Sequence, residues 1–327
     1  MSIVGMGALF CLLSAACFGA MAIFGKSAYD AGVHVGDLLL LRFAIAAVML
    51  LVIARKTGAL KGLSRRSIAA GLAMGGVGYA TQSGLFFGAL ERMDASLLAL
   101  ILYAYPVLVM IGAVALGCEK TSVRRVAALL VASLGTVLVL GGAASGSLDG
   151  LGTAMGFGAA IAYTAYILAG DRIGAAIPPV GLAALVCTGA TITFGLVSAV
   201  RGGPDLDFAP AGWGWIAAIA VISTVAAILM FFAGMARVGP STASILSTLE
   251  PVITVALAAV AFAESLAPLQ LVGGALVLSA TAVIQWPTRP AAPDSAGAPV
   301  LAGCVALAAE PVFGVDDAGR VDNDERA

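Results

Sequence analysis

Long hydrophobic runs separated by short polar segments repeat along the whole chain. Charged and turn-forming residues divide it into ten segments, approximately 4–25, 37–54, 68–90, 95–117, 125–142, 150–170, 180–200, 213–236, 241–262 and 268–286. A helix needs about 20 apolar residues to cross the hydrocarbon core of a bilayer. Unbroken runs of this kind exclude the alternating pattern of transmembrane β-strands, so we predict an all-α polytopic membrane protein with ten transmembrane helices.

Composition supports this class, because 61% of the 327 residues are hydrophobic and only 11% are charged. A soluble globular domain carries about 25% charged residues. The net charge of −1 provides no bulk attraction to nucleic acid. The five cysteines show no spacing typical of a metal site, so we expect them to be small core residues, with no metal and no cofactor.

The basic residues are unevenly distributed between the two sides of the predicted membrane. If the N-terminus is cytoplasmic, the opposite side holds only Lys26, Arg92 and Arg201, and nearly all other Lys and Arg residues are cytoplasmic. The positive-inside rule then places both termini in the cytoplasm. Residues 287–327 are rich in Ala and Pro and then acidic, which predicts a disordered cytoplasmic tail.

The two halves of the chain match at one constant offset of 145 residues. This offset pairs Pro106 with Pro251, and also Phe86 with Phe231, Phe87 with Phe232, Arg92 with Arg237, and Glu119 with Glu264. Each half holds five predicted helices, an odd number, so the second half enters the membrane from the opposite side. We predict two inverted-topology repeats, residues 1–145 and 146–286, an arrangement typical of secondary transporters. Gene duplication that only built a stable bundle is the alternative.

Two segments carry a resemblance to a known family, "ASLLALILYAYPVLVMIGAVALGCEKTSVRRVAALLVASLGTVLVL" and "STASILSTLEPVITVALAAVAFAESLAPLQLVGGALVLSATAVI". They resemble the two copies of the EamA-type repeat of the drug/metabolite transporter superfamily. The similarity covers nearly all of residues 1–286, and the first copy departs from the second with Tyr105 in place of Glu250. The resemblance implies a ten-helix transporter of the cytoplasmic membrane that exports amino acids or other small metabolites, similar to the bacterial aromatic amino-acid exporters.

The ionisable residues within the predicted helices are chiefly Arg42 and Glu250, and such residues are costly in lipid. Arg42 follows Asp37 by five residues, so we expect it to pair with Asp37 or reach the interface rather than bind substrate. Glu250 lies near the middle of its helix, beside Pro251. It can satisfy backbone groups freed by the proline kink, or contact a substrate amino group or carry a proton, and we favour the functional role.

Further polar and aromatic residues are predicted to line a central cavity with Glu250. The predicted substrate-binding set is Phe18, Tyr79, Gln82, Ser83, Phe86, Tyr163, Ser244, Ser247, Thr248 and Glu250, and the predicted hinge residues are Tyr105, Pro106 and Pro251. Ordinary interhelical packing is the alternative for each residue. The glycine runs "GLAMGGVG" and "GTAMGFG" are expected to allow close helix contact, and Glu119 and Glu264 to be capping or turn residues before the last helix of each repeat.

This predicted lining suits a neutral or zwitterionic amphipathic solute, such as an amino acid. No Arg cluster or mid-helix Lys is present to bind a phosphorylated substrate. We expect no enzyme activity, because the only histidine, His34, lies in a predicted loop and no HExxH motif occurs. We therefore predict a secondary transporter with a small solute and membrane lipid as partners, protons as a candidate coupling ion, and no protein partner. An exporter of other metabolites or drugs, or a passive channel, is the alternative.

Overall fold

The computed structural model describes residues 3–116, 123–142, 149–173, 177–238, 243 and 246–285, which form ten helical rods and no strand. The first half contains α1 (Ile3–Asp30), α2 (Val35–Lys56), the continuous run α3 (Arg65–Ala73), η1 (Met74–Tyr79) and α4 (Ala80–Leu90), the pair α5 (Ala95–Leu102) and α6 (Tyr105–Ala115), and α7 (Val123–Gly142). The second half contains α8 (Gly150–Ile173), α9 (Pro179–Val200), the run α10 (Ala211–Ala220), η3 (Val221–Ala226) and α11 (Ala227–Val238), then α13 (Leu249–Phe262) and α14 (Pro268–Gln285).

These elements confirm the predicted all-α membrane fold. Among the described residues, six helices are long and apolar enough to cross a membrane, and shorter apolar helices accompany them. The first helix continues five residues beyond its predicted end, to Asp30, because the polar residues after Gly25 extend the helix and the turn comes at Gly32, with a φ of 89°. The predicted tail, residues 287–327, lies outside the described residues.

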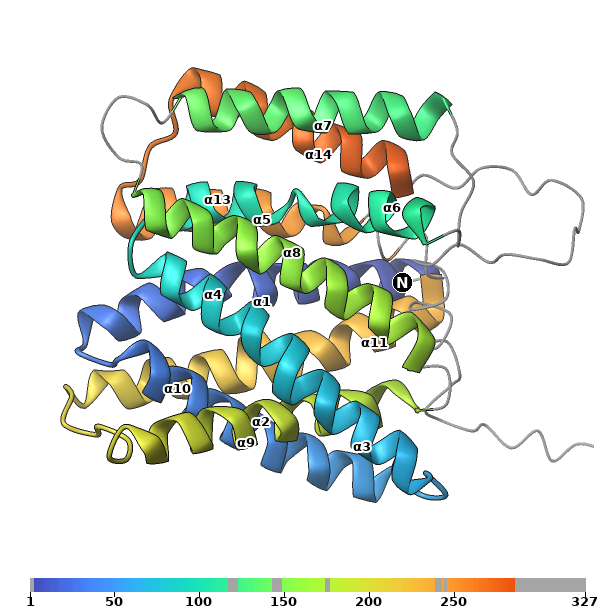
Figure 1. Ribbon diagram of the computed structural model, residues 1–327, viewed down its shortest axis with the longest axis vertical. Helices are drawn as coiled ribbons and strands as arrows, with labels where there is room; N and C mark the ends of the chain where they lie inside the picture. The colour runs from blue at the N-terminus through green and yellow to red at the C-terminus, as the bar shows by residue number, and fades with distance from the viewer. Residues whose placement is uncertain are drawn as a thin grey trace, which may run out of the picture.

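The contacts between the two halves join helices that correspond to each other in the internal repeat, or occur in corresponding pairs. The α7–α14 pair lies along one edge of the bundle, and α2 packs against α9 toward the other edge (Figure 1). These pairs join the fifth helices and the second helices of the two predicted repeats. Likewise α1 packs against α11 and α13, and α8 packs against their counterparts α4 and α6. The first helices of the repeats, α1 and α8, run in opposite directions (Figure 1), as inverted repeats require.

The π-helical segment η1 approaches α9 through glycines on both elements. A Cβ atom on Gly75 would overlap the carbonyl oxygen of Val186, and one on Gly189 would overlap the amide nitrogen of Gly76 in η1 and the carbonyl oxygen of Leu72 at the end of α3. Only glycine therefore allows these two backbones to come so close. The run "GLAMGGVG" makes the close helix contact that its composition predicts.

We expect Gly75→Ala to lower the free energy of unfolding by about 1–3 kcal/mol, because the added methyl must push η1 away from α9. Denaturation in mixed detergent micelles measures this change. Gly84→Ala is the matched control in the same rod, since a Cβ atom there would meet only the Phe194 ring, at 4.0 Å. Equal stability of the two variants would contradict the close backbone contact.

Glu264 does cap a helix, but a different one from the helix that we predicted. Its carboxylate accepts hydrogen bonds from the backbone amides of Ala95 and Ser96, at 3.1 and 3.0 Å, and from Ser96 Oγ at 2.8 Å. It therefore caps the N-terminus of α5. At the start of α14, the amide of Ala267 donates to Gln270 Oε1 instead, at 2.8 Å. The repeat partner Glu119 lies outside the described residues.

The same carboxylate also binds Lys26 near the end of α1, with Nζ 2.7 Å from Oε1. Glu264 thus links α1, α5 and the connection between α13 and α14. Burial raises the pKa of the Glu264 carboxyl, but the hydrogen bonds from Lys26 and Ser96 outweigh it, and the pKa lies below its ordinary value of 4.5. The link therefore requires an ionised carboxylate.

Candidate functional site

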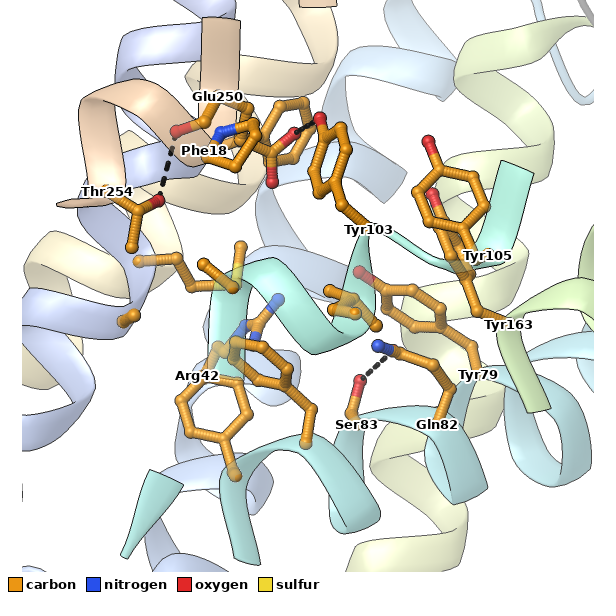
Figure 2. A pocket seen from close by; sticks show the side chains of 17 residues that line it. Phe18, Arg42, Tyr79, Gln82, Ser83, Tyr103, Tyr105, Tyr163, Glu250 and Thr254 are labelled. Carbon is orange, nitrogen blue, oxygen red and sulfur yellow. Dashed lines mark hydrogen bonds between the residues drawn. The ribbon is translucent and has the colours of Figure 1, made fainter. Parts of the chain in front are cut away.

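A cavity of about 130 Å³ lies between the two halves of the bundle (Figure 2). A single water molecule needs about 10–15 Å³ on the same measure, so the cavity has room for several waters or a small solute. Side chains from both halves form its wall: Phe18, Met21, Ala22, Arg42, Tyr79, Gln82, Ser83, Phe86, Phe87, Ala99, Leu102, Tyr103, Tyr105, Tyr163, Glu250, Pro251 and Thr254. The wall is mainly apolar and aromatic with a few polar groups, as is usual for small-molecule sites.

Two breaks in the helices bring polar groups to this cavity. α5 ends at Leu102, and α6 begins at Tyr105 with Pro106 in its first turn. In the same way, α13 begins at Leu249, with Pro251 in its first turn. Proline cannot donate to the preceding turn and clashes with it, so the chain stops being helical before each proline and restarts there. The shared proline of the repeat thus produces the same break in both halves.

Tyr103 connects the two breaks directly. Its hydroxyl donates to the backbone carbonyl of Ser247, with an O···O distance of 2.9 Å, and lies 3.3 Å from Glu250 Oε2 (Figure 2). On the other side of α13, Thr254 Oγ1 is 3.0 Å from the carbonyl oxygen of Gly19 in α1. The first two turns of α13 are therefore held between α1 and the break after α5.

Glu250 faces a group of tyrosines rather than a cation. Among the described residues, no Lys, Arg or His lies within salt-bridge distance of its carboxylate. The rings of Tyr103 and Tyr105 meet edge to face at 5.6 Å between centroids, and those of Tyr105 and Tyr163 at 4.7 Å. This part of the wall therefore offers aromatic faces, hydroxyl groups and one carboxyl without a charge partner.

Most of the predicted substrate-binding residues converge on the cavity. Those in its wall are Phe18, Tyr79, Gln82, Ser83, Phe86, Tyr163 and Glu250. Gln82 and Ser83 are joined by a hydrogen bond from the hydroxyl to Oε1, at 3.3 Å. The helical spacing that grouped Tyr79 with Phe86 therefore identified one face of a rod correctly, and their role in binding stays a prediction.

The remaining predicted residues have different outcomes. Ser247 and Thr248 precede α13 but are not in the cavity wall, and the hydroxyl of Ser247 donates to the carbonyl of Ala243 at 3.0 Å, as serine often does within a helix. Ser244 lies outside the described residues. Of the predicted hinge residues, Tyr105 and Pro251 line the wall and Pro106 does not.

Arg42 is in the cavity wall, and it does not form the predicted pair with Asp37. Its side chain is 1% exposed, and among the described residues no carboxylate lies within 4.0 Å of it. A spacing of five residues places the two side chains about 140° apart around a helix, whereas a spacing of three or four would bring them together. The spacing of five residues therefore already indicated, from the sequence alone, that Arg42 and Asp37 do not pair within this helix.

Tyr103 and Thr254 were also missed by the sequence analysis. Tyr103 lies three residues before Pro106, where the proline breaks the helix and frees its side chain to cross the cavity. Thr254 lies one helical turn after Glu250 and bonds to the Glu250 carbonyl oxygen at 3.1 Å. The i, i+4 relation to Glu250 could have identified Thr254.

Comparison with known proteins gives consistent matches. The model of the EamA-like transporter family matches the chain twice, over residues 5–141 and 150–286. The uncharacterized transporter YcbK of Bacillus subtilis (strain 168) is 23% identical over 283 residues, which covers 82% of this chain and 88% of that protein. A solved structure, described only as the crystal structure of a protein, has 20% identity and a TM-score of 0.62, covering 85% of this chain and 96% of its own. The chain therefore belongs to the EamA-like transporter family, and it is a membrane transporter rather than an enzyme.

Proposed function

We propose that this transporter exports small amphipathic metabolites, chiefly neutral and aromatic amino acids, across the cytoplasmic membrane. The observation that carries the proposal is the composition of the cavity, where tyrosine and phenylalanine rings surround one carboxyl without a charge partner. Aromatic faces suit an apolar side chain. A carboxylate in a site shielded from water suits an ammonium group, because opposite charges interact strongly there.

Alternating access is the proposed mechanism, and the symmetry of the contacts supports it. The packing of α1 on α11 and α13 has a counterpart in the packing of α8 on α4 and α6. Two related halves in opposite orientations can exchange conformations and so open one central site to each side in turn. Tyr105 and Pro251, at the two related breaks, are the proposed hinge positions in the cavity wall, with Pro106 beside them.

Glu250 is the proposed carrier of a proton or the partner of the substrate ammonium group. It lies in a membrane helix without a cation near it, and acids in such positions usually belong to a transport pathway. The distribution of Lys and Arg supports an orientation with both termini in the cytoplasm. In this orientation, Glu264 and Lys26 lie at the outer end of the bundle.

Transport in proteoliposomes loaded with a mixed pool of amino acids and other small metabolites, read by mass spectrometry, tests the proposal. We expect saturable efflux of aromatic and neutral amino acids, and stimulation by substrate on the opposite side. Flux that rises linearly without saturation would indicate a channel. Efflux confined to other metabolites, with no amino acid moving, would overturn the proposed substrate class, but the protein would still be a transporter.

A further inference from the structure

Arg42 is a buried cation whose charge has no counter-ion among the described residues. Its Nε donates to Thr224 Oγ1 at 3.1 Å, and the Tyr79 hydroxyl lies close to its side chain, but no hydrogen-bond partner lies within 3.5 Å of Nη1 or Nη2. An arginine offers five N–H donors, and four of these belong to the two Nη atoms. Most of its hydrogen-bonding capacity is therefore unused in this conformation.

A purely structural role does not explain this arrangement. Buried ionised groups are normally paired, and a buried donor left unsatisfied costs more than an apolar side chain of the same size. The Phe43 and Phe87 rings lie 4.7 and 5.2 Å from the guanidinium carbon, and such contacts offset only part of the loss of hydration. An apolar residue would pack against these rings at lower cost, so the cation needs another explanation.

The surroundings of Arg42 hold its free end toward the cavity. Thr224 lies in the π-helical segment η3, and its hydroxyl also donates to the carbonyl of Ile219 at 3.0 Å. This bond orients the Thr224 oxygen lone pairs toward Arg42 Nε. Nε is held by Thr224 and the guanidinium plane by two rings, so the Nη atoms lie on the side of Arg42 that faces the cavity, beneath other side chains of its wall (Figure 2).

The internal repeat supports a functional role for the position of Thr224, which holds Arg42. Thr224 is the counterpart of Tyr79 at the offset of 145 residues, and both lie in π-helical segments, η3 and η1. Tyr79 also lines the cavity and packs its ring against Phe43, at 5.6 Å between centroids. π-Helical turns are frequent at functional sites, because they displace side chains from the regular helical positions.

We propose that Arg42 binds the carboxylate of the transported solute through Nη1 and Nη2. A guanidinium binds a carboxylate with two parallel hydrogen bonds, and the two unpaired Nη atoms provide the donors for them. This assignment rests on the proposed function and narrows its substrate class to compounds that carry a carboxylate. With Glu250 in the same cavity, the site has one group for each charge of a zwitterion. A phosphate ester would bring a second negative charge, which no further Lys or Arg in the described wall could balance.

Access to Arg42 depends on the conformation of the wall. Both Nη atoms are fully covered in the structure, so wall side chains must move before a carboxylate can reach them. A ligand that binds one conformation better shifts the population toward it. Binding of the carboxylate is therefore coupled to a rearrangement of the cavity, as a carrier requires.

Ligand binding to the purified transporter tests this assignment without relying on flux. Phenylalanine and leucine are compared with their amides, which lack only the carboxylate charge, and with 3-phenylpropionate, which lacks the ammonium group. We expect the wild type to bind each acid at least about tenfold more tightly than its amide. Arg42→Gln should remove this difference by weakening the acids alone, and Arg42→Lys should restore part of it.

Arg237→Gln is the matched control, because Arg237 also lies over a ring, that of Phe10, at 5.2 Å, but is not in the cavity wall. Thr224→Val should weaken the preference for acids without removing it.

Equal binding of acids and amides by the wild type overturns the assignment, as does an unchanged preference in Arg42→Gln or no binding of any carboxylate. If Arg42→Gln does not fold, the assignment is tested by the preference for acids over amides in the wild type and in Arg42→Lys. Binding of 3-phenylpropionate through Arg42 without amino-acid flux would overturn the proposed function alone.

Discussion

Glu250→Gln is expected to lower amino-acid flux in proteoliposomes about 30-fold or more, and to make the remaining flux independent of an imposed pH gradient. Glutamine keeps the size of the side chain and a hydrogen bond to the Tyr103 hydroxyl, but it can neither pair with an ammonium group nor carry a proton. Truncating one member of a charge pair that is shielded from water costs about 2–5 kcal/mol, which corresponds to this loss.

Glu91→Gln is the matched control for this variant, because Glu91 is an exposed carboxylate at the end of α4, outside the cavity wall. It should transport like the wild type at every pH. If Glu250→Gln retains both the rate and the pH dependence of the wild type, Glu250 acts neither as a proton carrier nor as the ammonium partner. A normal rate with the pH dependence lost would assign Glu250 to proton coupling alone.

Glu264→Gln is expected to lower the free energy of unfolding by about 2–4 kcal/mol, measured by denaturation in mixed micelles. The side chain is 6% exposed, and its carboxylate accepts bonds from Lys26 and from the first residues of α5. Glutamine retains a single acceptor oxygen, so some of these donors lose their partner and Lys26 loses its counter-ion. The ends of α1 and α5 would then be held together less strongly.

This loss should depend on pH in one direction. The pKa of Glu264 is lower in the folded protein than in the unfolded chain, so its contribution is complete above about pH 4.5 and disappears as pH falls through the folded value. The stability difference between wild type and Glu264→Gln should therefore shrink on acidification. Asp94→Asn is the control, because Asp94 is 51% exposed and lies 3.7 Å from Lys26, so its loss should cost less than about 1 kcal/mol. A Glu264→Gln protein as stable as the Asp94→Asn protein would contradict the proposed link.

The helices could be predicted closely because their cause is local. An apolar run of bilayer length leaves the backbone no hydrogen-bonding choice other than a helix, whatever its neighbours are. The internal offset of 145 residues likewise needs only the sequence, and it correctly related Pro106 to Pro251 as two helix breaks. Where the prediction was wrong, the partner lay far away in the chain, as in the capping of α5 by Glu264.

The candidate site was less predictable from the sequence, because its residues contact partners that lie far away in the chain. The sequence by itself determined that Glu250 is an acid in lipid beside a proline, and that Tyr79, Gln82 and Phe86 share a helix face. Only the tertiary structure decided that Tyr103 crosses to Glu250 and that Thr224, 182 residues away, holds Arg42. Helical periodicity reports the face on which a side chain lies, but which charges find partners is decided by the packing of helices from both repeats. That packing leaves Arg42 and Glu250 in the wall of one cavity.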